Sequence, residues 1–181
     1  MNRWLWVSVM AVSGCAAFGE AQVPEAAEIA LPADAAPPGL TFNGTAEGEA
    51  ALTDVVISGR TEDFLALGGF VDGHVRRFSG DGGAVLSLAL VFADEADAGD
   101  ALELFLDELE SDVGYGLNDG QASEWGDEGT CATGPVPTPI GEETICVWRT
   151  GSVVMALGGA MDPDRFDDIG ADMDRRASGA G

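Results

Sequence analysis

The chain has no lysine, a single histidine (His74), one tyrosine and three cysteines among its 181 residues. These shortages exclude several kinds of site. Histidine-dependent catalytic triads, histidine-rich metal sites, Schiff-base chemistry and P-loops each need a group that is missing. No Gly-x-Ser-x-Gly motif is present either. We therefore predict a protein that is not an enzyme and that holds no cofactor and no metal.

Carboxylates are the one catalytic group that the chain has in excess. Glycoside hydrolysis needs only two acids at a suitable separation, so a carboxylate-dependent hydrolase stays as the third interpretation of function. With 32 acidic residues, however, two neighbouring acids carry little information.

The chain has eight arginines and 32 acidic residues, and its formal net charge is −24. Such a surface repels nucleic acid and anionic lipid headgroups, so neither is expected as a partner. A very acidic, lysine-free surface is typical of a protein that stays soluble in high salt, where repulsion is screened. The same charge also deters aggregation in any habitat. A saline habitat is our hypothesis, and equal stability of the domain without salt and in molar salt would contradict it.

The N-terminus carries a short apolar segment that ends in Val12-Ser13-Gly14-Cys15. One basic residue, Arg3, precedes a mostly apolar run over residues 4–12. That run is too short to cross a bilayer, which takes about 20 residues. The pattern predicts a signal peptide over residues 1–14. Its last four residues resemble the lipobox of bacterial lipoprotein precursors.

In that family the lipobox cysteine becomes the mature N-terminus and carries the lipid, which implies lipidation of Cys15. The protein would then be anchored by its lipid to the outside of the cell envelope. Ala16 is not the aspartate that retains such proteins at the inner membrane, which implies the outer membrane in a two-membrane bacterium. The alternative is a plain signal peptide that is cut nearby, with Cys15 discarded.

The other two cysteines, Cys131 and Cys146, remain as a pair if Cys15 carries lipid. A disulfide between them would persist in an oxidising compartment. Their spacing is not Cys-x-x-Cys, so a structural bridge is favoured over a redox role.

Residues 15–39 are predicted to form the lipidated cysteine and a disordered tether, because the segment is rich in Ala, Pro and Glu. Residues 40–178 are long enough for one globular domain with a core. At its start the signals are mixed. An Asn43-Gly44 turn follows Phe42, residues 50–57 fit a helix or a strand, and residues 61–67 fit a short helix.

Two similar units follow. Residues 70–79 and 84–92 predict a hairpin whose second strand is almost continuously apolar, and a helix capped by Asp94 comes next. The same order returns as strands over 144–149 and 152–157 and a helix that starts at Asp162-Pro163. Two such hairpin-helix (ββα) units predict an α+β fold, one antiparallel sheet with both helices packed on it in two layers. The connector over 114–143 is expected to be long and turn-rich.

In this layout the chain resembles the small envelope lipoproteins of high-GC bacteria and, more distantly, the extracellular sensor domains of some mycobacterial kinases. The resemblance implies a sheet with a cleft that binds a small molecule or another envelope component. We therefore predict a non-catalytic ligand-binding or sensor module. The alternative is a structural lipoprotein that docks another envelope protein through an aromatic surface around Trp125.

Arginine is scarce, so its positions are informative. Arg76 and Arg77 on one hairpin and Arg149 on the other fall at similar points of the two units. We consider two interpretations, ion pairs with neighbouring acids and an anion-contacting group on the sheet. These arginines and Trp125 are the candidate ligand-binding residues. His74 is interpreted as a partly exposed strand residue, and the acids of residues 162–174 as a solvated helical face instead of a calcium loop.

Overall fold

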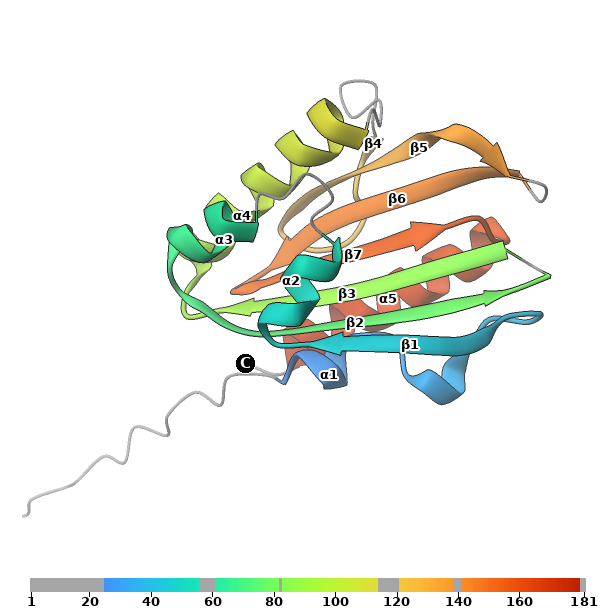
Figure 1. The fold of residues 1–181 in the computed structure, drawn as a ribbon, viewed down its shortest axis with the longest axis horizontal. Coiled ribbons are helices and arrows are strands. Elements are labelled where there is room, and N and C mark those ends of the chain that lie inside the picture. The colour runs from blue at the N-terminus through green and yellow to red at the C-terminus, as the bar shows by residue number, and fades with distance from the viewer. Residues whose placement is uncertain (1–24, 56–60, 82, 114–120, 139–140, 180–181) are drawn as a thin grey trace, which may run out of the picture.

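The computed structural model describes residues 25–55, 61–81, 83–113, 121–138 and 141–179. Seven antiparallel strands form one sheet in the order β1-β2-β3-β7-β6-β5-β4, and helices cover both of its faces (Figure 1). The α+β antiparallel sheet predicted from the sequence is confirmed.

The two hairpin-helix units are both present. The first consists of β2 (Phe70–Gly80), β3 (Gly83–Phe92) and α4 (Glu95–Glu108), and α4 continues as a π-helical turn, Leu109–Val113. The second consists of β6 (Gly141–Thr150), β7 (Val153–Gly159) and α5 (Pro163–Gly179). β3 and β7 pair at the centre of the sheet and join the units. Asp94 caps α4 as expected, since its side chain accepts from the backbone N–H groups of Ala96 and Asp97 at 2.9 and 3.0 Å.

The two helices lie on opposite faces, so the predicted two-layer arrangement is wrong and the domain has three layers. Leu88 and Leu90 of β3 pack in the core beneath α4, whereas Ala89 and Val91 pack in the core beneath α5. Successive strand residues point to opposite faces, and a strand covered on both sides needs apolar residues at every position. That is the physical reason for the continuous apolar run in β3.

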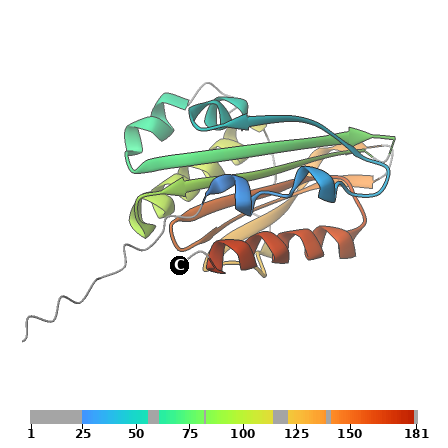
Figure 2. The ribbon, with the colours of Figure 1, turned by 90° about the horizontal axis from the view of Figure 1, so that it is seen from below.

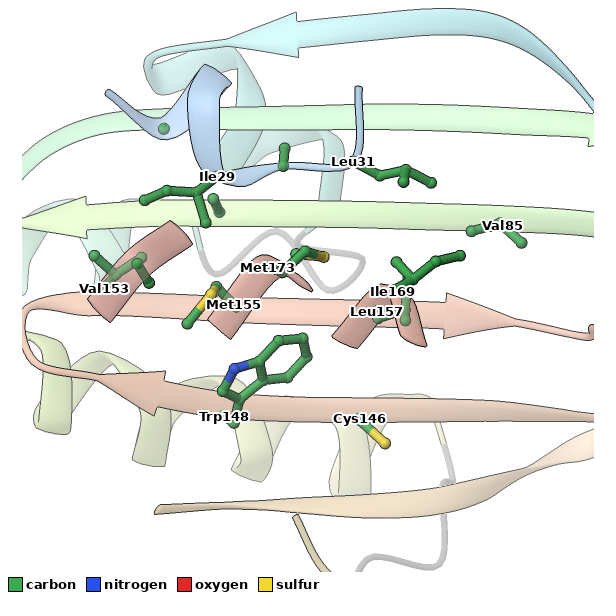
Figure 3. Packing of buried hydrophobic residues seen from close by; sticks show 14 of the residues in the cluster. Ile29, Leu31, Val85, Cys146, Trp148, Val153, Met155, Leu157, Ile169 and Met173 are labelled. Carbon is green, nitrogen blue, oxygen red and sulfur yellow. The ribbon is translucent and has the colours of Figure 1, made fainter. Parts of the chain in front are cut away.

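The segment before residue 40 is ordered where a tether is predicted. It contains α1 (Ala26–Ile29) and a 3₁₀ turn, Ala33–Ala35, and it covers the α5 face of the sheet (Figure 2). Ile29 and Leu31 are buried in the same layer as Val85 and Met173, as Figure 3 shows. The predicted disordered tether is therefore wrong for residues 25–39, while residues 15–24 lie outside the described part of the chain.

Polar contacts hold this segment in place. The buried hydroxyl of Ser87 accepts from the backbone N–H of Leu31 at 2.9 Å, and Arg76 donates to the carbonyl oxygens of Ala30 and Leu31 at 2.9 and 3.0 Å. Backbone groups that are buried must find partners, and these side chains of β2 and β3 supply them.

Three further elements precede β2. They are β1 (Thr41–Glu47), α2 (Glu49–Val55) and α3 (Thr61–Leu67), and the short helix over residues 61–67 is confirmed. The expected Asn43-Gly44 turn is wrong, because both residues lie within β1, where the register with β2 shifts between Phe42 and Gly44. Pairing with the long strand β2 outweighs the local turn preference of these two residues.

The last elements are β4 (Gln121–Ala122) and β5 (Glu128–Thr138), which occupy much of the expected connector over 114–143. β5 pairs with β6 along most of its length. Cys131 and Cys146 stand directly opposite each other in this pair and form the predicted disulfide. Part of the predicted connector is therefore a strand that extends the sheet.

Candidate functional site

A cavity of about 380 Å³ opens on the face of the sheet that carries α4. We call it the sheet-face pocket. Its floor is formed by Leu86, Ile145, Ala156 and Gly158, its wall by Phe105 and Leu109 of the α4 region, and its rim by Asn43, Asp54, Arg77 and Glu143. An apolar floor with a few polar groups at the rim is the usual composition of a small-molecule site.

Small residues on β7 create this hollow. Gly158 pairs with Leu86 on one side and with Ile145 on the other. A Cβ atom built on Gly158 would lie 3.6 Å from the nearest side-chain atom of Ile145, an ordinary contact distance. Space for a side chain therefore exists above Gly158. Because glycine has no side chain, this space stays open at the floor of the pocket.

The rim carries one cation, which is already paired. Arg77 donates from Nη2 to the backbone carbonyl oxygen of Asp54 at 2.9 Å and from Nη1 to the Asp54 carboxylate. These bonds connect β2 to the end of α2 at the pocket mouth. The half-buried side chain of Glu143 contributes a second carboxylate from β6. The charged groups of the rim sum to −1, so the pocket itself does not attract anions.

The structure does not bring the three candidate arginines together. Arg76 lies on the opposite face of β2 from Arg77, where it donates hydrogen bonds to carbonyl groups of the N-terminal segment. Arg149 lies at the far end of β6, where its Nε donates to Glu128 at 2.7 Å and its Nη1 donates to the carbonyl oxygen of Gly151 at 2.8 Å. The ion-pair interpretation thus describes Arg77 and Arg149, and the anion-contacting group is not formed.

Trp125, the fourth candidate, packs against α5. Its ring centroid lies 5.0 Å from that of Trp148 and 6.1 Å from that of Phe166. A Cβ atom on Gly170 would meet the Trp125 ring at 2.3 Å, so the indole occupies the notch that this glycine leaves in the helix. Trp125 also lines a second cavity, of about 300 Å³, beside the disulfide. It is remote from the sheet-face pocket.

His74 is buried, so its interpretation as a partly exposed residue is wrong. Its Nε2 lies 3.1 Å from Thr45 Oγ1, and its Nδ1 lies 3.9 Å from a carboxylate oxygen of Glu47. Burial lowers the pKa of His74 below its ordinary value, and the nearby charge of Arg76 lowers it further, while Glu47 and Asp72 oppose the shift. The imidazole is therefore neutral in the folded protein at neutral pH.

This burial predicts a pH dependence of stability. Between the lowered pKa of the folded state and the ordinary value of 6.5, the unfolded chain binds more protons, so the free energy of unfolding falls as the pH decreases through this window. We expect His74→Asn to flatten this slope. Urea unfolding at several pH values on either side of 6.5 measures it, and subtracting the two curves removes the titration of the shared carboxylates. Identical slopes would contradict the prediction.

Two of the acids in residues 162–174, Asp162 and Asp172, interact within the helix itself. Asp162 accepts from the N–H of Arg165 at 3.3 Å in the first turn, and Asp172 forms ion pairs with Arg175 and Arg176. Within the described ranges, no group of three or more His, Cys, Asp or Glu side chains is arranged to hold a metal ion.

Comparison with known proteins gives one likeness. No model of a known protein family matches the chain, and no curated protein matches it. Among solved structures, the extracellular domain of PknH from Mycobacterium tuberculosis is similar, with a TM-score of 0.54 and 9% sequence identity. The match covers 78% of this chain and 86% of that domain. The likeness is one of fold. It agrees, in architecture alone, with the layout that the sequence shares with extracellular domains of mycobacterial kinases.

The sheet-face pocket could not be located from the sequence. Asp54, Arg77 and Gly158 come from three elements that are distant in the chain, and only the tertiary fold brings them to one pocket. In the sequence, Gly158 and Gly159 stand at the end of an apolar strand. Glycines in a strand can mark a bulge, a bend or a close approach of backbone or ligand, so they do not by themselves predict a pocket.

Proposed function

We propose that the chain is a non-catalytic, extracytoplasmic ligand-binding or sensor module whose binding site is the sheet-face pocket. The observation that carries this proposal is the combination of an apolar floor and a sparse polar rim in a cavity of about 380 Å³. Cavities of roughly 300–1,000 Å³ with this composition are the usual sites of small ligands.

The lining indicates the kind of ligand. Leu86, Phe105 and Ile145 offer apolar contact, while Asn43 and Glu143 offer hydrogen bonds at the mouth. Because Arg77 is already bound by Asp54, an anionic group would have to displace that carboxylate. We therefore expect a mainly apolar molecule with a neutral or cationic polar end.

Catalysis is not part of the proposal. The single histidine lies in β2, and its side chain is hydrogen-bonded to Thr45 of β1. Asp54 and Glu143 are two carboxylates on one rim, but Asp54 is committed to Arg77. Carboxylate-dependent hydrolysis needs both groups available to substrate. A binding role does not require either carboxylate to be free of its present contacts.

The proposed location outside the cytoplasm rests on the lipobox-like residues Val12 to Cys15 and on the disulfide between Cys131 and Cys146. The fold shared with an extracellular domain is in agreement with it. No helix in the described part of the chain is both long and apolar enough to span a membrane. Lipid anchoring through Cys15 and the saline habitat stay as proposals.

The alternative, a structural lipoprotein that docks a protein through Trp125, is less well supported. Trp125 packs into the notch at Gly170 and against Trp148, which removes much of its ring from solvent. In the described part of the chain, the large hydrophobic side chains that are exposed are Phe42, Leu65 and Val71, and they come from three separate elements. Single exposed apolar residues need no partner.

A glycine substitution tests the proposed site. Gly158→Val places a side chain above the pocket floor, where a Cβ fits beside Ile145, and valine is well suited to a strand. We expect it to reduce ligand binding at least tenfold, because the added methyl groups occupy the cavity. Gly44→Val is the matched control, since a Cβ on Gly44 meets nothing within 4 Å. Gly44 lies in β1, outside the pocket lining.

Two measurements report the result. Native mass spectrometry of the chain, recovered from its own envelope without harsh washing, should show a small-molecule adduct on the wild-type and Gly44→Val proteins but not on Gly158→Val. The neutral fluorescent probe N-phenyl-1-naphthylamine should show the same order of binding. Equal adducts and equal probe binding in all three proteins would overturn the assignment of the site. A wild-type protein without any adduct and without probe binding would favour the protein-docking alternative.

A further inference from the structure

The second cavity, of about 300 Å³, has a different chemistry from the sheet-face pocket. It lies on the other face of the sheet, between the turn before β5, strand β6 and the first turn of α5. The lining includes the aromatic side chains Trp125 and Phe166, the thioether of Met161, the disulfide, and the carboxylates of Glu124 and Asp167. We call it the aromatic pocket.

The aromatic side chains of this pocket are held in place before any ligand arrives. The ring centroids of Trp125 and Phe166 lie 6.1 Å apart with an angle of 33° between the ring planes. Trp125 is fixed from two further sides, by Trp148 at 5.0 Å and by the backbone of α5 at Gly170. A ligand would therefore meet a rigid π surface, and little side-chain entropy would be lost on binding.

The charges at the pocket are negative. Glu124 and Asp167 are exposed carboxylates of the lining, and none of the described residues that line this cavity is an arginine. The N-terminus of α5 adds a partial positive charge of roughly +0.5, which two full negative charges outweigh. The net charge of −24 adds to the local potential and raises the concentration of cations near the surface.

We propose that the aromatic pocket binds a small organic cation with a methylated, quaternary ammonium group. Aromatic faces attract such a cation through the ring quadrupole. Unlike a primary ammonium, a quaternary group has no N–H donors to satisfy, so apolar walls such as Met161 and the disulfide are suitable neighbours. Glu124 and Asp167 supply the balancing charge from the mouth of the pocket.

A metal ion fits this site poorly. Calcium takes six to eight oxygen ligands and magnesium takes six, whereas the lining offers two separate carboxylates beside aromatic, thioether and disulfide groups. The chemistry of the walls thus selects a large, weakly hydrated cation over a small, strongly hydrated one.

Choline and 3,3-dimethylbutan-1-ol form a matched pair of probes, because the neutral alcohol has the shape of choline with carbon in place of the charged nitrogen. We expect the full chain to bind choline about tenfold more tightly than the alcohol, by isothermal titration or by saturation-transfer NMR of the methyl signals. Equal affinity for the two probes, or no detectable binding of choline, would overturn the proposal.

Two sets of variants locate the effect. Trp125→Leu keeps an apolar side chain but removes the π surface, and it should abolish the preference for choline over the alcohol. Asp167→Asn should weaken choline binding, whereas Asp168→Asn removes the same charge from the next, exposed residue outside the lining and should not. Equal loss of choline affinity in the two aspartate variants would show that only the overall negative charge matters. An unchanged preference for choline in Trp125→Leu would show that the cation does not contact the indole ring. Either result contradicts the site.

The proposal is independent of the sheet-face pocket. Gly158→Val fills the cavity on the α4 face and should leave choline binding unchanged. Failure of one site therefore cannot be mistaken for failure of the other.

Discussion

Trp148→Ala is expected to lower the free energy of unfolding by about 3–5 kcal/mol, the usual cost of truncating a large buried aromatic side chain. Trp148 is completely buried on the α5 face of β6, beside Met155 (Figure 3), and its ring supports Trp125 at 5.0 Å. For a chain of this length, such a loss lowers the melting temperature on the order of 10 °C. Urea and thermal unfolding of the two proteins measure the effect.

Trp148→Phe is the informative control. The Nε1 atom of Trp148 is buried, and in the described part of the chain it has no hydrogen-bond partner. An unsatisfied buried donor costs about 1–3 kcal/mol, so replacing tryptophan with phenylalanine removes this cost while it leaves a smaller cavity. We expect Trp148→Phe to lose less than half of what Trp148→Ala loses. Equal losses in the two variants would contradict this account of the site.

The Cys131–Cys146 disulfide is expected to contribute about 3 kcal/mol, because it closes a loop with a sequence separation of 15 residues in the unfolded chain. The double variant Cys131→Ala/Cys146→Ala removes the cross-link without introducing new polar atoms at the buried position of Cys146. Its unfolding midpoint in urea should fall accordingly.

A reducing agent provides the matched comparison for this prediction. It should destabilise the wild-type protein by about as much as the double variant is destabilised, and it should leave the double variant unaffected. If the wild-type protein is equally stable with and without the disulfide, the hairpin of β5 and β6 holds itself together, and the cross-link does not limit the unfolded state.

Local patterns in the sequence were sufficient to predict the helices and strands, but not to predict which face of the sheet each helix covers. Helical spacing and the Asp94 and Asp162 signals located α4 and α5, and alternating or continuous apolar residues located β2, β3, β6 and β7. Which face each helix covers is a tertiary property. The continuous apolar run in β3 already indicated that both faces of the sheet are covered, because a strand with one exposed face alternates apolar and polar residues.

The three candidate arginines are not grouped in the structure, for a reason that the sequence also contained. Arg76 and Arg77 are consecutive residues of one strand, and consecutive strand residues point to opposite faces. They could not both face one ligand. What the sequence could not supply was their partners, because the carbonyl groups near Ala30 and the carboxylate of Asp54 come from segments that fold back over β2.

The N-terminal segment was mistaken for a tether because it has few large apolar residues. Ile29 and Leu31 are sufficient here, since each is almost fully buried and the small residues Ala26 and Ala30 allow the backbone to approach the sheet closely. Composition alone underestimates such a segment, because its partner Ser87 lies in a strand more than fifty residues away.

The docking of α1 also fixes the point at which a membrane tether would join the domain. If Cys15 carries a lipid as proposed, roughly ten residues separate it from Glu25, a reach of at most about 35 Å. Arg176, near the end of α5, lies within 3.4 Å of the carbonyl oxygen of Glu28, so the chain leaves the domain at the C-terminal end of that helix. α5 has 17 residues and spans about 25 Å, and the aromatic pocket lies at its other end. Under this proposal, the tether joins the domain at the end of α5 that is remote from the aromatic pocket.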